Sequence, residues 1–179
     1  MKDLETFINY GNYDSSKIKE ILLSSNLDWD EFTLRQVIFP PHRKTKTIPI
    51  LFNPDFDSNI PTPSKNYHLF EEEIKKLESY FTTLFNEEGN ILRAILVLLP
   101  AGKKIPTHID KGNSLTKVKR CHLSIYTNDD CLFTVGEETR NFQEGTLWQI
   151  NNITWHSVSN NGDTDRVHLI ADWNKKNNE

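Results

Sequence analysis

The sequence has only two cysteines, no basic leader and no long apolar run, and each of these absences excludes a class of protein. Cys121 and Cys131 stand in no paired motif, so we expect reduced, buried thiols rather than a disulfide framework. The longest apolar run, Ala94 to Leu99, is far too short to cross a bilayer. The first residues lack the basic and apolar stretches of a secretory signal. We therefore expect a cytoplasmic protein with no membrane partner.

Positive charge is also in short supply, because 21 Lys and Arg face 25 Asp and Glu and leave a net charge of −4. Binding to nucleic acid needs a basic face that displaces counterions from phosphate, so this balance argues against a nucleic-acid partner. The cations gather in two clusters, within residues 35–46 and 103–120. Two interpretations of these clusters stay open. They are solvated loop charge, or they line a site for an anionic or zwitterionic small molecule.

Length and aromatic content predict a folded core. A chain of 179 residues fits one domain, and such a domain buries roughly 70% of the surface of its unfolded chain. Ten Phe, four Trp and five Tyr supply enough aromatic volume for that core. No internal repeat or low-complexity segment interrupts the chain. We expect a single domain over residues 1–179, and no pattern predicts an oligomeric state.

Two amphipathic helices are predicted in the first half of the chain. In Lys17 to Leu23, apolar residues share one face at helical spacing. From Tyr67 to Asn86, apolar side chains recur at intervals of three and four until Gly89 ends the pattern. Such a stripe is typical of a helix that packs on a core, so we expect both helices to cover a sheet.

Short strands account for most of the remaining chain. Phe32 to Phe39 and Thr47 to Phe52 contain β-branched and aromatic residues and predict two strands around a basic turn. Later short segments are separated by Asn, Asp and Gly turns; they are 91–99, 118–126, 131–135, 147–150, 156–159 and 166–173. Regularly spaced short strands indicate a sandwich or small barrel. We therefore predict an α+β, mainly β fold, in which residues 1–90 form a cover with substrate-side elements and residues 91–173 form the barrel core with its metal site.

A candidate metal motif lies in the second half: His108-Ile-Asp110, followed 46 residues after the aspartate by His156. On an extended segment, residues i and i+2 point to the same side, so His108 and Asp110 can reach one metal while Ile109 turns into the core. His156, expected on another strand, would supply the third ligand. Two imidazoles and one carboxylate leave half of an octahedron open, which suits ferrous iron that also holds a cosubstrate and dioxygen. The alternative is a loop histidine and a core histidine without metal.

The segments LLPAGKKIPTHID, KRCHLSI, FQEGTLWQINN, TWHSV and DRVHLIADW follow one another between Leu98 and Trp173. This stretch resembles the aspartyl/asparaginyl β-hydroxylase family of iron- and 2-oxoglutarate-dependent dioxygenases. The resemblance implies a double-stranded β-helix, a jelly-roll or cupin-like barrel with helices packed on one sheet. It also implies that His108, Asp110 and His156 bind Fe(II), with 2-oxoglutarate and O2 as cosubstrates.

The same resemblance implies that Arg120, His122 and Arg166 bind 2-oxoglutarate. A planar guanidinium can grip a carboxylate through two parallel hydrogen bonds and stays charged in a dry pocket. Arg166 is the best candidate for the carboxylate far from the metal. Arg120 and His122, again at i and i+2, can face one cavity while Cys121 faces away. The alternative for this pair is a surface cation and a core histidine.

Smaller members of the family hydroxylate free amino acids, so the resemblance implies a small-molecule amino acid or a residue in a peptide as substrate. Substrate contacts are expected from the basic segment near the barrel mouth and from two tryptophans, namely Arg35, His42, Arg43, Trp148 and Trp155. Core packing is an equally good interpretation of both tryptophans.

The predicted activity is C–H hydroxylation coupled to conversion of 2-oxoglutarate into succinate and CO2. Hydrogen abstraction needs no general base, so no catalytic residue is expected beyond the metal ligands. Two alternatives remain: a cupin-like metal enzyme that does not use 2-oxoglutarate, and a non-catalytic binding module for small molecules. A nucleic-acid demethylase is disfavoured by the acidic balance.

Overall fold

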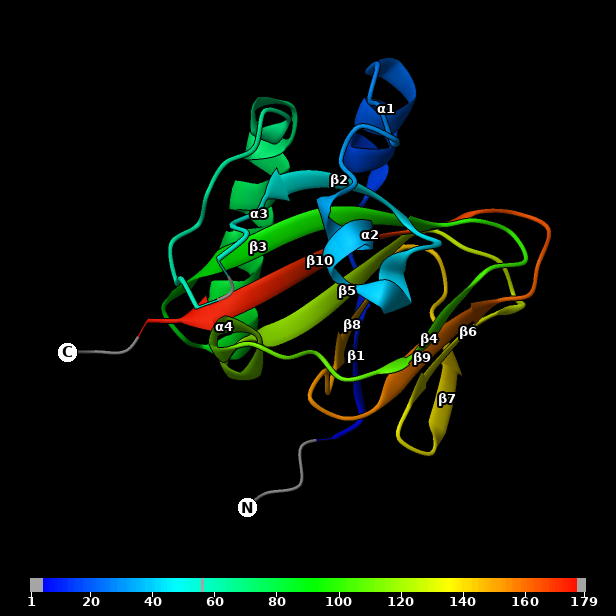
Figure 1. Cartoon of the computed structure of the whole chain (residues 1–179). Coiled ribbons are helices and arrows are strands. Elements are labelled where there is room, and N and C mark those ends of the chain that lie inside the picture. Colours follow the sequence, from blue (N-terminus) through cyan, green and yellow to red (C-terminus); the bar gives the residue numbers. More distant parts are fainter. Residues whose placement is uncertain (1–4, 56, 177–179) are drawn as a thin grey trace.

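The computed structural model describes residues 5–55 and 57–176, which form two antiparallel sheets and several helices (Figure 1). The helices are α1 (Ser16–Ser24), α2 (Leu34–Ile38), α3 (Tyr67–Phe85) and α4 (Asn113–Lys117), with a 3-10 turn at Pro40–His42. The strands are β1 (Phe7–Asn12), β2 (Lys46–Leu51), β3 (Gly89–Leu99), β4 (Lys104–His108), β5 (Lys119–Tyr126), β6 (Cys131–Val135), β7 (Glu138–Asn141), β8 (Thr146–Ile150), β9 (His156–Asn160) and β10 (Arg166–Lys175). One sheet has the order β1-β8-β5-β10-β3-β2 and the other β4-β9-β6-β7. This is the predicted double-stranded β-helix.

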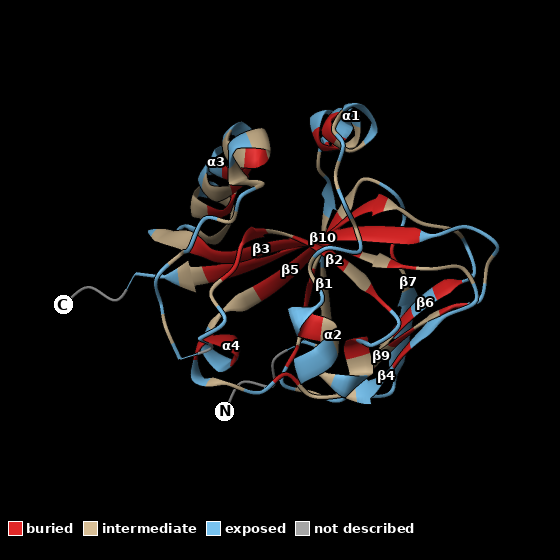
Figure 2. Ribbon diagram, turned by 45° about the horizontal axis from the view of Figure 1, so that its top comes forward, coloured by how far each residue is buried: buried red, intermediate tan, exposed pale blue. Residues whose placement is uncertain are grey.

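The six-stranded sheet has a different covering on each face. Figure 2 shows α1 and α3 on one side of it, with α2 and the four-stranded sheet on the other. Because side chains alternate along a strand, each long strand serves both faces. On β10, Leu169 and Trp173 join the core under the helices. Arg166, Ile170 and Asp172 alternate with them and face the space between the sheets.

Strand register brings charged and polar residues of this inner space together. Asp172 of β10 is the direct partner of Arg93 on β3 and of Arg120 on β5. Three neighbouring strands therefore place one carboxylate between two guanidiniums. In the four-stranded sheet, His108 of β4 is paired with His156 of β9. Residues far apart in the sequence thus meet through the pairing of the strands.

Both predicted helices are confirmed as α1 and α3, and the predicted strands after Gly89 are confirmed as β3, β5, β6, β8, β9 and β10. The strand predicted at Phe32–Phe39 is wrong, because this segment contains α2 and leads into the 3-10 turn. The apolar residues of this segment are not the buried ones: Val37 is 73% exposed, whereas Arg35 is only 8% exposed. A buried arginine among exposed apolar residues is the reverse of the pattern on which the strand prediction was based.

Three strands were not predicted from the sequence. β1 contains Gly11 and two asparagines, β4 contains Pro106, and β7 is a short, largely exposed strand at a sheet edge. Glycine, asparagine, proline or exposed polar residues therefore interrupt the pattern by which the other strands were found. Their pairing with β8, β9 and β6 determines their conformation.

The cysteines and the apolar segments agree with the exclusions made from the sequence. Cys121 and Cys131 are free and buried, as predicted. Within residues 5–55 and 57–176, no helix has the length and apolarity needed to cross a membrane.

Gly89 of β3 lies very close to Trp173 and Asn174 of β10, so a larger residue at this position tests how tightly the two strands pack. A Cβ atom at this position would lie 2.5 Å from the Cζ2 atom of Trp173 and 2.5 Å from the carbonyl oxygen of Asn174. The indole is itself held in the core against Phe81. We therefore expect Gly89→Ala to destabilise the protein by about 1–3 kcal/mol through overpacking. Urea unfolding measures this loss, and an unchanged midpoint would contradict the packing.

Candidate metal and cosubstrate site

Two adjoining pockets lie between the sheets and under α2. The outer pocket has a volume of about 410 Å³ and includes Trp155 in its wall, while the inner pocket extends to Arg166. Five polar residues line both pockets, namely Arg35, His42, His108, Asp110 and Arg120. The pockets therefore meet at the predicted metal-binding motif.

The rings of His108 and His156 are fixed in the same way. Nδ1 of His108 lies 2.8 Å from the carbonyl oxygen of Pro106, and Nδ1 of His156 lies 2.8 Å from that of Thr154. A carbonyl only accepts hydrogen bonds, so Nδ1 carries the proton in each ring and Nε2 keeps its lone pair. Burial lowers the pKa of both histidines, which favours the neutral rings. Histidines that bind metals are commonly held by this kind of bond on the second nitrogen.

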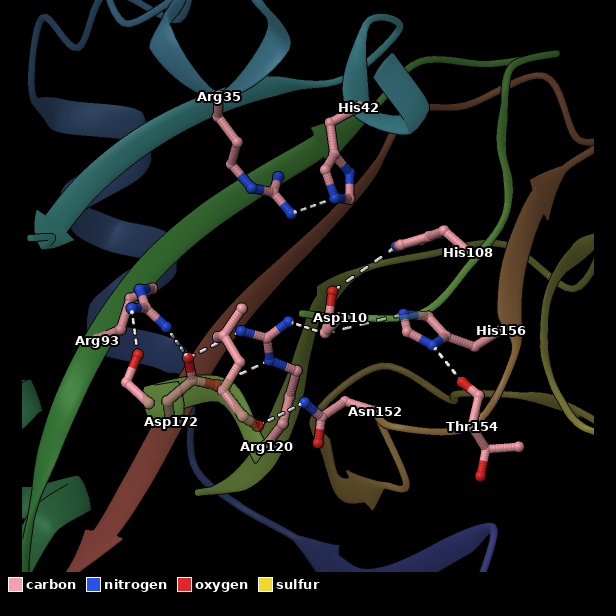
Figure 3. A network of polar contacts seen from close by, with 12 residues as sticks. Arg35, His42, Arg93, His108, Asp110, Arg120, Asn152, Thr154, His156 and Asp172 are labelled. Atoms are coloured by element: carbon pink, nitrogen blue, oxygen red, sulfur yellow. Dashed lines mark hydrogen bonds and ion pairs between the residues drawn. The ribbon is translucent and has the colours of Figure 1, made fainter. Parts of the chain in front are cut away.

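Both free nitrogens face the carboxylate of Asp110 (Figure 3). Nε2 of His108 lies 3.9 Å from Oδ1, and Nε2 of His156 lies 3.9 Å from Oδ2. The two ring centroids are 4.2 Å apart. Two ligand atoms that are each about 2.1 Å from one ion lie at most roughly 4.2 Å apart. Each histidine nitrogen therefore lies within the separation that a shared ion allows from one oxygen of Asp110, and two imidazoles with one carboxylate suit ferrous iron.

The expected position of Ile109 is wrong. Ile109 is partly exposed and lines the outer pocket, because β4 ends at His108 and the alternation of a strand does not continue past it. Asp110 is instead held by a loop contact, in which its backbone N–H donates to the carbonyl of Asn152 at 3.1 Å. The carboxylate still reaches the histidines, but by a different path from the one predicted.

A third imidazole, His42, lies close to the same carboxylate. Potential ligand atoms of His42, His108 and Asp110 lie within 4.8 Å of one another. However, Nε2 of His42 lies 3.1 Å from Nη2 of Arg35, which can only donate. The lone pair on Nε2 of His42 is therefore directed at the guanidinium of Arg35. His156, the third ligand predicted from the sequence, has no such competing donor on Nε2 among the described residues.

A buried ion-pair network supports Asp110 from behind. Arg120 grips Asp172 through Nε and Nη2, both at 2.8 Å, and its Nη1 donates to Asp110. Arg93 donates to the same Asp172 carboxylate at 2.7 Å. Burial alone would raise the pKa of Asp172, but attraction and hydrogen bonds from Arg120 and Arg93 outweigh it and lower this pKa to about 2. The carboxylate therefore stays ionised and fixes Arg120 against Asp110.

This network changes the interpretation of Arg120. The resemblance implied a 2-oxoglutarate contact, yet all three guanidinium nitrogens already bond carboxylates. Arg93 and Asp172 were not predicted from the sequence. The available signal was a lone charged residue inside each of two buried apolar runs, ILRAILVLL and VHLIADW. A charge in such a run needs a partner, and strand register supplies it.

Arg166 has a different environment at the far end of the inner pocket. Its side chain is buried, and within the described part of the chain its Nε and Nη1 have no hydrogen-bond partner. His122 lines the same pocket, and its Nε2 is also without a described partner. The guanidinium of Arg166 also has a side-chain hydrogen bond with Cys131, whose thiol is a weak partner. A carboxylate would supply the acceptors that Nε and Nη1 lack.

The predicted substrate residues separate into two groups. Arg35, His42 and Trp155 line the outer pocket, and the indole of Trp155 is 59% exposed. Arg43 is exposed, and it is not among the described residues that line either pocket. Trp148 also does not line either pocket, and its ring stacks on Phe142 with 4.7 Å between centroids. Packing explains the position of Trp148.

Comparison with solved structures supports the fold. An oxidoreductase of the 2OG-Fe(II) oxygenase family from Burkholderia pseudomallei is similar over 96% of this chain and 85% of its own, with a TM-score of 0.70 and 15% identity. The viral collagen prolyl hydroxylase of Paramecium Bursaria Chlorella virus-1, solved as a 2OG complex, is similar over 98% of both chains, with a TM-score of 0.61 and 7% identity. A Pseudomonas putida prolyl-4-hydroxylase is similar over 96% of this chain and 94% of its own, with a TM-score of 0.55 and 10% identity. At these identities the likeness shows a common fold.

Sequence comparison is informative at the level of the family. No curated protein sequence matches the chain. The family model described as aspartyl/asparaginyl beta-hydroxylase matches residues 2–176, almost the whole length. The chain therefore belongs to the aspartyl/asparaginyl β-hydroxylase family.

Proposed function

We propose that this protein is an Fe(II)- and 2-oxoglutarate-dependent hydroxylase that acts on an amino acid, free or within a peptide. One observation carries the proposal. His108, Asp110 and His156 converge with their free ligand atoms facing one another, and the adjoining pocket ends at Arg166, whose Nε and Nη1 have no described hydrogen-bond partner. A ferrous ion and an organic diacid fit these two features.

In this proposal His108, Asp110 and His156 bind the iron. Iron, when bound, would activate O2, of which one atom enters the C–H bond of the substrate while the other oxidises 2-oxoglutarate to succinate and CO2. The protein positions the groups. Backbone carbonyls hold the histidine rings, and Arg120 holds the carboxylate of Asp110. A fixed set of three ligands leaves the remaining coordination positions for exchangeable groups.

Arg166 binds the far carboxylate of 2-oxoglutarate in the inner pocket. The walls beside it include apolar side chains such as Val97, Ile150 and Val158, which exclude water and strengthen the ion pair. His122 lies in the same lining and contributes a second polar contact. We do not assign Arg120 to the cosubstrate, because its nitrogens hold Asp110 and Asp172.

The outer pocket receives the substrate. The structural similarity to two prolyl hydroxylases supports an amino-acid or peptide substrate. α2 and the 3-10 turn form one wall of this pocket, so residues 1–90 contribute the substrate side of a single dioxygenase domain. α2 and the 3-10 turn therefore cover the open end of the barrel on this side.

The test is a screen for substrate-triggered turnover. Protein loaded with Fe(II) and 2-oxoglutarate without oxygen is exposed to air in the presence of single amino acids or short peptides, and succinate is measured. We expect at least one compound to raise succinate release, and we expect His156→Ala to abolish the increase. Metal binding together with oxidation that needs no 2-oxoglutarate would instead support a cupin-like enzyme. Absence of iron uptake would support a binding module.

A further inference from the structure

Arg35 is a buried guanidinium that has no carboxylate in hydrogen-bonding contact among the described residues. It lies on α2 and is 8% exposed. Its Nη2 contacts Nε2 of His42 at 3.1 Å, and its Nη1 has no hydrogen-bond partner in the described part of the chain. The contrast with Arg93 and Arg120 is clear, because those two share Asp172. A buried charge without a partner is costly unless a ligand supplies one.

His42 orients this guanidinium. Nη2 of Arg35 can only donate, so Nε2 of His42 accepts its hydrogen bond. Nδ1 then carries the proton, and it has no described partner. The ring of His42 also packs edge-on against His108, with 5.0 Å between centroids. The pair is thus fixed beside the proposed iron ligands (Figure 3).

The outer pocket has an excess of positive charge. Among its described lining residues, four are cationic, namely Arg35, Arg93, Lys111 and Arg120, and Asp110 is the one carboxylate. Much of the remaining lining is apolar, including Phe39, Phe52, Ile95 and Leu115. Its volume of about 410 Å³ lies near the small end of ligand pockets, which span roughly 300–1,000 Å³. A compact, mostly apolar molecule with one negative group fits this lining.

We infer that Arg35, oriented by His42, binds the carboxylate of the substrate in the outer pocket. This inference rests on the proposed function and makes it more specific. A residue inside a polypeptide has no main-chain carboxylate, so the substrate class is a free apolar amino acid or a carboxy-terminal apolar residue. Planar guanidinium is suited to this role because it holds a carboxylate through two parallel hydrogen bonds.

The experiment compares acids with their neutral amides. The probes are L-valine, L-leucine, L-proline and L-phenylalanine, each paired with its carboxamide, and binding is measured by anaerobic titration calorimetry. We expect one or more acids to bind the protein loaded with Fe(II) and 2-oxoglutarate at least tenfold more tightly than the matching amide. Arg35→Met should remove this preference, and Arg35→Lys should retain part of it. Arg43→Met, an exposed change on the same segment, is the matched control and should leave it intact.

Three results would overturn the subsite: equal binding of acids and amides, an acid preference that survives in Arg35→Met, or no binding of any acid to protein that still binds 2-oxoglutarate. The affinity for 2-oxoglutarate is measured first in every variant, which also reports correct folding. If the unmodified protein does not bind 2-oxoglutarate, that result counts against the proposed function and not against the carboxylate subsite. In that case the same acid and amide pairs, titrated into the metal-free protein, still decide whether Arg35 recognises a carboxylate.

Discussion

Replacing Arg166 by methionine should weaken 2-oxoglutarate binding by about 2 kcal/mol or more, which is roughly thirtyfold. The guanidinium is 1% exposed, and its Nε and Nη1 have no described hydrogen-bond partner. Methionine keeps much of the apolar volume but removes the charge and both donors. The carboxylate of the cosubstrate would then enter a dry pocket without a counter-ion. Anaerobic titration of 2-oxoglutarate in the presence of Fe(II) measures the loss.

The matched control for this change is Arg140→Met. Arg140 lies on the exposed strand β7 and pairs with Glu138 at the surface, so its removal should leave the affinity unchanged. Arg166→Lys should give an intermediate result, since lysine keeps the charge but not the planar fork. Equal affinities in all three variants would remove Arg166 from the cosubstrate site.

Replacing Asp172 by asparagine should destabilise the protein by about 3–5 kcal/mol near neutral pH. The amide has nearly the shape of the carboxylate, but it leaves Arg93 and Arg120 without the buried anion that they share. Urea unfolding measures the effect. Asp163→Asn, at an exposed position, is the control and should change stability little.

The stability lost in Asp172→Asn should also depend on pH. The pKa of Asp172 is about 2 in the folded protein, below its ordinary value of 3.8. A carboxyl group whose pKa is lowered on folding stabilises the fold above its unfolded pKa, and this contribution disappears as the pH falls through the folded pKa. The stability gap between the unmodified protein and Asp172→Asn should therefore narrow between about pH 4 and pH 2. A gap that stays constant over this range would contradict the ionised state of Asp172.

The same substitution should also weaken iron binding. Asp172 holds two nitrogens of Arg120, and the third nitrogen of Arg120 holds Asp110. Without this anchor the proposed ligand carboxylate loses its fixed orientation. A variant that folds but binds iron as tightly as the unmodified protein would limit Asp172 to a role in stability.

Local patterns in the sequence were sufficient to predict His108 and Asp110 as neighbours and Arg120 and His122 as residues of one cavity. Spacing along β5 carries this information for Arg120 and His122, because alternate side chains share a face. Asp110 lies beyond the end of β4, and a loop contact with Asn152 brings it to His108 instead. The partner of Arg120 could not be predicted in this way. It depends on the register between β5 and β10, which places Asp172 opposite Arg120 across more than fifty residues of chain. For the same reason the sequence could not distinguish Arg120, whose nitrogens hold two carboxylates, from Arg166, whose Nε and Nη1 have no described partner.

The cover segment was harder to predict than the barrel. In residues 34–38 the apolar side chains are largely exposed and the arginine is buried, so hydrophobic pattern gave the wrong element. Burial of Arg35 is determined by the pocket and by His42, which are tertiary features. Departures of this kind between local pattern and structure are expected at functional sites.

The most direct test of the account is the stoichiometry of Fe(II) binding under anaerobic conditions. We predict one ion per chain in the unmodified protein and in the exposed-histidine control His68→Ala, and loss of that ion in Asp110→Ala and His156→Ala. His42→Ala should still bind one ion, because His42 directs its lone pair at Arg35. One ion retained in Asp110→Ala and His156→Ala, or lost in His42→Ala alone, would contradict a centre built from His108, Asp110 and His156.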